Sequence, residues 1–245
     1  MLFDQIEYFF EHLRVEKSAS RLTLSSYRTD LLQFLDFVAQ KYGLAVQDVG
    51  EDLLNHKNVR EYLGHMQRQG LSRASIARKL AALRSFVRFL CRENIIEHNP
   101  IAAVNTPRQD KKLPRFLYPP EIDLLLNAPD TSRALGKRDR ALLEMAYATG
   151  LRVSELVGIN KQDINWDEEL VKVTGKGDKQ RLVPIGSITL KEIDNYLAYR
   201  ATMPVITDQN ILFLNRRGKR LSRVMVFNIV REAAAAAGIE KTISP

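Results

Sequence analysis

The 245-residue sequence has few of the residues that form disulfides or metal sites. Its single cysteine, Cys91, lies in the apolar stretch FVRFLCREN, with no disulfide partner and no neighbouring base to activate it as a nucleophile. The four histidines, His12, His56, His65 and His98, are scattered through the first hundred residues without ligand-like spacing. We therefore interpret Cys91 as a small core residue and expect no metal site.

Long apolar runs are absent as well, since no stretch approaches the roughly 20 residues that span a bilayer. The N-terminal sequence MLFDQIEYFFEHL carries acidic residues where a signal peptide requires positive charge. We therefore expect a cytoplasmic protein. The charge that is present has one dominant sign, because 37 Lys and Arg against 29 Asp and Glu give a net charge of +8. This excess favours a polyanionic partner but does not identify one.

The chain is long enough for two cores, and its hydrophobic periodicity predicts that the first is helical. Helices are expected at about residues 2–16, 21–42, 55–69 and 72–94. A polar, proline-containing stretch, NTPRQDKKLPRFLYPPE, then interrupts the periodicity. We place the domain boundary there, with a first domain at 1–107, a linker at 108–117 and a second domain at 118–245.

The second domain is predicted to mix helices with a few strands. Pro119 suits the first turn of a helix, and Gly150 suits a left-handed cap at the end of RDRALLEMAYAT. After the short helix VSELVG, two β-like runs separated by GKGDK predict a hairpin. Further helices are expected at about 188–201 and 222–237, with Ser222 as an N-cap. The predicted fold class is mainly α with a small β-hairpin or sheet.

The fourth predicted helix is the first candidate for nucleic-acid binding. From Arg68 to Arg92 the sequence has seven basic residues and no acidic one. Small residues beside these cations would allow a close approach to a phosphate backbone. The alternative is a solvated helix face without a partner. The candidate contacts on this helix are Arg73, Arg78, Lys79, Arg84 and Arg88.

The string ATGLRVSELVGI places Arg152 directly after a helix-terminating glycine, with Glu155 one turn further on. A guanidinium held on a rigid turn can form two parallel hydrogen bonds to a phosphate, which suits phosphoryl transfer. Glu155 could orient that guanidinium. The alternative is a local ion pair between the two residues that only ties the turn.

The predicted hairpin tip, GKGDKQR, presents Lys176 between two glycines. Gly175 and Gly177 permit the positive φ angles of a tight turn and leave room for a nucleic-acid backbone. Lys176 could donate a proton to a leaving oxygen, although a lysine at a hairpin tip is more often a solvated turn residue. Lys179 and Arg181 follow as candidate DNA contacts.

A third basic candidate is the turn RRGKRLSR, which has five basic residues and no acid and leads into a predicted helix. Backbone amides at a helix N-terminus favour phosphate. Together with the helix that carries Arg84 and Arg88, this turn is expected to hold a duplex from opposite sides, in a C-shaped clamp. The candidate contacts here are Arg216, Arg217, Lys219, Arg220 and Arg223.

The order of these motifs resembles that of the tyrosine recombinases, and of the Xer type in particular. ATGLRVSELVGI is followed by the hairpin VTGKGDKQRLVPIG and then by ILFLNRRGKRLS. TLSSYRTDLLQFLDF and LSRASIARKLAALRSFVRFLCRENIIEHNPI are similar to the core-binding domain of that family. The resemblance covers essentially the whole chain and implies a helical, SAM-like core-binding domain followed by an α+β catalytic domain.

The resemblance implies a role for three residues: Arg152 is the first catalytic arginine, Lys176 the general acid of the hairpin, and Glu155 a supporting acid. Members of the family cleave DNA by attack of a tyrosine hydroxyl on a phosphodiester, without a metal or nucleotide cofactor. Their H-x-L-R-H block and their nucleophilic tyrosine are expected after the ISP that ends this chain. Tyr147 is interpreted as a core residue. We therefore expect a catalytic domain truncated at its C-terminus, and a chain that binds DNA without cleaving it.

The implied parent protein is a site-specific recombinase that acts as a homo- or hetero-tetramer on a double-stranded DNA recombination site, in the nucleoid and away from membranes. Chromosome dimer resolution, a step of chromosome partition at cell division, fits the resemblance best. A phage or transposon integrase is the enzymatic alternative. A DNA-binding protein without catalytic activity is the alternative from another class. The chain alone is expected to be mainly monomeric.

Overall fold

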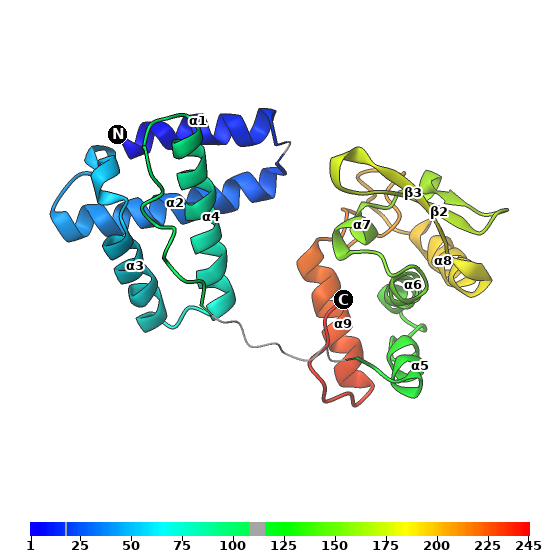
Figure 1. Cartoon of the computed structure of the whole chain (residues 1–245). Helices are drawn as coiled ribbons and strands as arrows, with labels where there is room; N and C mark the ends of the chain where they lie inside the picture. Colours follow the sequence, from blue (N-terminus) through cyan, green and yellow to red (C-terminus); the bar gives the residue numbers. More distant parts are fainter. Residues whose placement is uncertain (18, 108–115) are drawn as a thin grey trace. The chain divides into compact units, whose positions relative to one another are not determined.

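The computed structural model describes residues 1–17, 19–107 and 116–245, with only the main chain at Lys176. Most of the linker predicted at 108–117 therefore lies outside the described residues. The chain divides into two compact units, Met1–Lys112 and Leu113–Pro245 (Figure 1). We call them the N-terminal unit and the C-terminal unit.

The N-terminal unit is helical, as its sequence predicts. Its helices are α1 (Leu2–Val15), α2 (Arg21–Tyr42), α3 (His56–Arg68) and α4 (Arg73–Arg92), with the short 3-10 turns η1 (Val46–Asp48) and η2 (Glu51–Leu53) between α2 and α3. Serine side chains begin two of them: the hydroxyl of Ser20 accepts the amide of Thr23, and that of Ser72 accepts the amide of Ser75, both at 3.2 Å. The predicted helices are confirmed.

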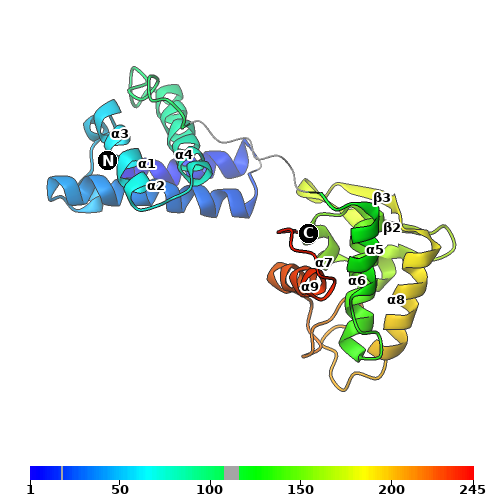
Figure 2. The ribbon, with the colours of Figure 1, turned by 90° about the horizontal axis from the view of Figure 1, so that it is seen from below.

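The core of this unit forms where α4 packs against α1 and α2, which lie side by side in both ribbon views (Figures 1 and 2). Phe9 of α1 lies between two rings of α4, with centroids 5.4 Å from Phe86 and 5.4 Å from Phe89. Cys91 packs at the edge of this core. Apolar residues that recur at steps of three and four along α4 are all buried, namely Ile76, Leu80, Leu83, Val87 and Leu90.

The C-terminal unit combines helices with one antiparallel sheet of order β1-β2-β3. Its elements are α5 (Pro119–Asn127), α6 (Ala134–Thr149), α7 (Val153–Gly158), η3 (Lys161–Asp163), β1 (Ile164–Asn165), β2 (Leu170–Thr174), η4 (Lys176–Asp178), β3 (Gln180–Pro184), α8 (Gly186–Arg200) and α9 (Arg223–Ala236). The predicted hairpin is β2–β3, and the two-residue strand β1 extends it. The fold class, mainly α with a small sheet, is confirmed.

Several local predictions for this unit are confirmed as well. Gly150 ends α6 with φ +57°, the left-handed cap that glycine adopts easily. The hydroxyl of Ser222 accepts the amide of Met225 at 3.2 Å and so begins α9. Val171 and Val173 on β2 are fully buried, and their position fixes the register of the hairpin against the core.

None of the helices in residues 1–17, 19–107 and 116–245 combines the length and the apolarity that crossing a bilayer requires.

Candidate functional site

Arg152 occupies the residue before α7, immediately after the turn that ends α6. Its main-chain amide donates to Glu155 Oε2 at 2.9 Å, so the side chain one turn ahead fixes the start of the helix. The guanidinium itself points outward, with 79% of the side chain exposed, whereas only 6% of the Glu155 side chain is exposed. The turn therefore presents a positive group to solvent from a rigid base.

The buried carboxylate of Glu155 is held mainly by a second arginine. Arg181, on β3, donates through Nη1 to Glu155 Oε1 at 3.0 Å and through Nη2 to Oε2 at 2.9 Å. This two-point bond is shorter than the 3.3 Å bond from Arg152 Nη1 to Glu155 Oε1. Arg181 is the main cause of the lowered pKa of Glu155, which falls to about 2. Glu155 therefore ties the hairpin to the start of α7.

The sequence predicts a DNA contact at Arg181 and an orienting partner for Arg152 at Glu155. In the structure, Glu155 does contact Arg152, but the shorter side-chain bonds to its two oxygens come from Arg181. Arg181 therefore has a structural role in holding the hairpin to α7, although 45% of its side chain remains exposed. Because the two partners are 26 residues apart, sequence spacing alone could not pair them.

The hairpin loop lies against this ion pair. A methyl group added at Gly175 would lie 3.5 Å from Arg181 Nη1 and 3.6 Å from Glu155 Oε1. The left-handed residues of the loop are Gly177 at φ +72° and Asp178 at φ +57°, while Gly175 has φ −100°. The expectation of a positive φ at Gly175 is therefore wrong, and Asp178 adopts that conformation instead.

Lys176 directly follows Gly175, so its main chain lies next to the contact between Glu155 and Arg181. Its side chain lies outside the described residues. Lys179, two residues after Gly177, is exposed. The structure thus brings the main chain of the hairpin tip to the turn that carries Arg152.

The other end of α7 is held by Arg220, which sequence analysis assigns to DNA. Its Nη1 donates to the carbonyl of Val157 at 2.8 Å and to that of Ile159 at 3.3 Å, and its Nη2 donates to Asn160 Oδ1 at 2.7 Å. A cation at the C-terminus of a helix satisfies the carbonyls that lack partners there. Arg220 is half-buried, and these bonds position the short helix that follows Arg152, so the residue has a structural role beside the DNA contact predicted for it.

The remaining cations of the basic turn lie on the surface. The turn is built on Asn215, whose Oδ1 accepts the amide of Arg217 at 2.8 Å and that of Lys219 at 3.2 Å. Gly218 has φ +70°, and a methyl group there would lie 1.9 Å from the carbonyl oxygen of Val205, so only glycine fits. The exposed cations of this turn are Arg216, Arg217, Lys219 and Arg223.

In the N-terminal unit, the predicted basic face of α4 divides into surface and internal residues. Arg88 and Arg73 are exposed. Arg84 is half-buried and donates to Thr106 Oγ1 at 2.7 Å and to the carbonyl of Val104, so it ties α4 to the segment after it. Arg84 is therefore partly occupied by a structural contact.

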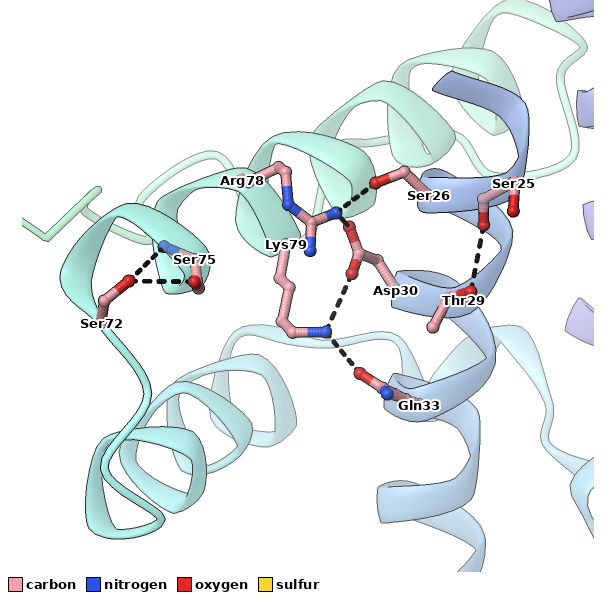
Figure 3. Close-up of polar contacts among 9 residues, drawn as sticks. All are labelled: Ser25, Ser26, Thr29, Asp30, Gln33, Ser72, Ser75, Arg78 and Lys79. Carbon is pink, nitrogen blue, oxygen red and sulfur yellow. Dashed lines mark hydrogen bonds and ion pairs between the residues drawn. The ribbon is translucent and has the colours of Figure 1, made fainter. Parts of the chain in front are cut away.

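The expectation that Lys79 contacts DNA is wrong. Only 6% of this residue is exposed, and its ammonium donates to Asp30 Oδ1 at 2.8 Å and to Gln33 Oε1 (Figure 3). Asp30 comes from α2 and also accepts a bond from Arg78. The segment from Arg68 to Arg92 lacks an acid in sequence, but a neighbouring helix supplies one.

Sequence analysis missed Asp30 as part of the site, although a signal was present. Asp30 stands one turn before Phe34 and next to Leu31, both of which are 1% exposed, so it occupies the buried stripe of an amphipathic helix. An acid in such a place needs a partner inside the fold. Tyr147 shows the opposite error, because it was interpreted as a core residue and is 60% exposed.

Within the described ranges, no group of three or more His, Cys, Asp or Glu side chains could hold a metal ion.

Two family models match the chain. The model of the phage integrase family matches residues 115–245, and that of the phage integrase N-terminal SAM-like domain matches residues 6–94. The tyrosine recombinase XerC of Pelotomaculum thermopropionicum is 44% identical over all of this chain and 81% of its own length. The tyrosine recombinase XerD of Staphylococcus aureus is 36% identical over 98% of this chain and 80% of its own length.

Solved structures show the same fold. The XerH site-specific recombinase bound to its difH substrate before cleavage superposes with a TM-score of 0.73 at 21% identity, covering 98% of this chain and 70% of that one. A lambda integrase fragment bound as a dimer to a core site gives 0.69 at 19% identity, covering 99% and 83%. The chain belongs to the phage integrase family and, by its relatives, is a tyrosine recombinase.

Proposed function

We propose that this tyrosine recombinase binds a duplex recombination site and that Arg152 receives the phosphate at which the strand is exchanged. The observation that carries the proposal is the pairing of an exposed guanidinium with a buried carboxylate. Arg152 is 79% exposed, yet its main chain and one guanidinium nitrogen are bonded to Glu155. A cation whose base is rigid loses little freedom when it binds a phosphate oxygen.

Each residue of the cluster has a proposed part in the reaction. Arg152 balances the charge that develops on the phosphoryl oxygens, and Glu155 with Arg181 holds the hairpin beside it. As in the family that the chain belongs to, a tyrosine hydroxyl attacks phosphorus, a 3′-phosphotyrosyl bond forms, and the 5′ oxygen leaves with a proton from Lys176. The reverse attack by another 5′ hydroxyl then rejoins the strand, so the bond energy is retained.

We further propose that a polypeptide of these 245 residues binds DNA without cleaving it. No tyrosine hydroxyl in the described part of the chain bonds to Arg152, Glu155 or Arg181. Burial raises the pKa of Tyr62 and of Tyr196, which is the opposite of an activated nucleophile. The hydroxyl of Tyr196 is also occupied, since it accepts the amide of Leu214 at 3.0 Å.

The biological role proposed for the parent protein is chromosome dimer resolution in the nucleoid, because the relatives are named XerC and XerD. In this role both units contact one duplex, and recombinases assemble as a tetramer on two recombination sites. The 245-residue chain without DNA is proposed to be a monomer, which sedimentation can check. A DNA-free tetramer would contradict this part of the proposal.

Two experiments test the function. Fluorescence anisotropy with a labelled duplex, over a salt series from about 50 to about 200 mM, should show affinity that falls steeply with salt, since phosphate contacts release counterions. A duplex nicked next to the cleavage position, which traps the covalent intermediate, should give no protein–DNA adduct with the 245-residue chain. An adduct would refute the proposed absence of a nucleophile, and salt-independent or undetectable binding would refute the proposed DNA contact.

A further inference from the structure

The buried acid Asp30 has no part in the proposed reaction, yet it organises the face shared by α2 and α4. It is 1% exposed and contacts two consecutive residues of α4, Arg78 through Oδ2 and Lys79 through Oδ1 (Figure 3). One carboxylate thus faces two cations. The cluster retains one net positive charge inside a polar setting.

The two cations of this cluster differ in position and therefore in use. Lys79 is 6% exposed and bonds to Asp30 and Gln33, so its ammonium is internal and balances the buried carboxylate. Arg78 is not needed for that balance, and 47% of its side chain is exposed. Only its Nη1 is engaged, by Asp30 and by Ser26 Oγ at 2.6 Å.

The other donors of Arg78, Nη2 and Nε, make no hydrogen bond with any described residue. One nitrogen of the guanidinium is therefore anchored by two acceptors, as Figure 3 shows, and 47% of the side chain remains exposed. A planar guanidinium held at one nitrogen by two acceptors keeps its other donors in a defined direction, which suits a bond to a phosphate oxygen.

The chemistry around Arg78 also fits an anion. Residues 19–29 and 68–92 contain no Asp or Glu, and the carboxylate that bonds to Arg78 is that of the buried Asp30. The hydroxyl of Ser26 accepts from Arg78, and further hydroxyl side chains lie on α2 at Ser25 and Thr29 and at the start of α4 at Ser72 and Ser75 (Figure 3). Hydroxyls and cations without a competing surface carboxylate are the groups that proteins place against a DNA backbone.

We infer that Asp30 is a positioning residue: it holds the guanidinium of Arg78 in place for a phosphate of the bound duplex, while Lys79 supplies the counter-charge that burial of Asp30 requires. This inference rests on the proposed function and names a further contact within it. The negative charge of Asp30 by itself would weaken DNA binding, whereas the inference predicts that Asp30 strengthens it.

The decisive experiment compares Asp30→Asn with Asp36→Asn by anisotropy on the same duplex. Asp36 is an exposed residue of the same helix, and each substitution raises the net charge of +8 by one unit. If charge alone mattered, both variants would bind DNA more tightly. The inference predicts tighter or unchanged binding for Asp36→Asn, and binding weaker by about fivefold for Asp30→Asn, because the anchored guanidinium is released.

Asp30→Asn leaves Lys79 buried without its counter-charge, so a second variant protects the test from misfolding. Asp30→Asn combined with Lys79→Met removes both charges and leaves the net charge at +8. Circular dichroism establishes that this variant is folded. It should also bind about fivefold more weakly than the wild-type chain, since Arg78 again lacks its carboxylate.

Arg78→Ala should weaken binding about tenfold, the loss of one hydrogen bond to a charged group, and should lower the slope of log K against log salt by about one. In the Arg78→Ala background the Asp30 and Lys79 substitutions should cause no further loss, because they act through Arg78. Additive losses, or an Asp30 variant that binds as tightly as wild type, would overturn the inference alone. A wild-type chain that binds no duplex would overturn the proposed function together with it.

Discussion

Each unit contains a buried carboxylate that two cations share, and the two arrangements are built differently. Asp30 joins two long helices and faces one internal lysine and one half-exposed arginine. Glu155 lies at the start of the short helix α7 and faces two exposed arginines, one local and one from the hairpin. The first acid is enclosed by packing, whereas the second holds a turn and a hairpin together.

The difference shows how burial decides what a shared acid does. Only 6% of Lys79 is exposed, so removing Asp30 leaves a buried ammonium without its counter-charge. Arg152 and Arg181 can both be hydrated if Glu155 is removed, so the fold depends less on that acid. Asp30 should therefore contribute more to the stability of its unit, whereas Glu155 should contribute more to the positions of Arg152 and the hairpin.

The largest predicted effect is the loss of stability caused by Asp30→Asn. Leaving Lys79 buried and unpaired should reduce the free energy of unfolding of the N-terminal unit by about 3–5 kcal/mol. Trp166 is the only tryptophan of the sequence and lies in the C-terminal unit, so its fluorescence follows that unit while circular dichroism follows both. The part of the circular dichroism signal that comes from the N-terminal unit should be lost at a lower denaturant concentration, while the midpoint of the fluorescence transition should not change.

The matched control adds Lys79→Met to Asp30→Asn and should recover most of the lost stability, because an apolar side chain needs no counter-charge. If the double variant is as unstable as the single one, Asp30 stabilises the unit through contacts other than its charge. The proposed difference between the enclosed acid Asp30 and the bridging acid Glu155 would then be contradicted for Asp30.

Glu155→Gln should have the next largest effect, about 2 kcal/mol on the C-terminal unit at neutral pH. The pKa of Glu155 is lowered from 4.5 to about 2 by Arg181, so its contribution is complete above pH 4.5 and is lost as the pH falls toward 2. The difference between wild type and Glu155→Gln in urea unfolding, followed by Trp166 fluorescence, should therefore be smaller at pH 3 than at pH 7. A difference that does not change with pH would show that the charge of Glu155 does not stabilise the C-terminal unit.

A smaller effect is expected at the opposite end of α7. Arg220→Met should destabilise the C-terminal unit by about 1–2 kcal/mol, because the carbonyls of Val157 and Ile159 lose a charged donor. The exposed Arg217→Met is the control and should leave unfolding unchanged. Equal effects of the two substitutions would mean that Arg220 is an ordinary surface cation, and that α7 is held at its N-terminus alone.

The sequence was sufficient for features that depend on neighbours along the chain. Hydrophobic periodicity located the helices α1 to α4, and the cap residue Gly150 located the end of α6. The pairing of Arg152 with Glu155 could be considered because the two residues are three positions apart. In each case the physical cause lies within one or two helical turns.

Features that depend on tertiary contacts could not be predicted in the same way. Asp30 and Lys79 are 49 residues apart, and Arg220 is 63 residues from Val157, so neither partner is visible in a local pattern. A count of basic residues treats every cation as free, yet folding buries Lys79 and bonds Arg220 to the end of α7. Candidate contacts from charge runs therefore need the structure to separate surface cations from internal ones.

The central claim is that burial of its acid makes Arg152 a phosphate ligand rather than an ordinary surface cation. Arg133 is the matched comparison, since it is 83% exposed and also pairs with an acid three residues away, but that acid, Asp130, is 55% exposed. Arg152→Ala and Arg133→Ala remove the same charge from the same unit, and neither should change stability by more than about 0.5 kcal/mol.

The most direct measurement is the affinity of these two variants for a labelled duplex across a salt series. We predict that Arg152→Ala weakens binding about tenfold and lowers the salt slope by about one, while Arg133→Ala leaves both quantities close to wild type. Equal losses in the two variants would contradict the account, because Arg152 would then contribute only its charge and not a positioned contact.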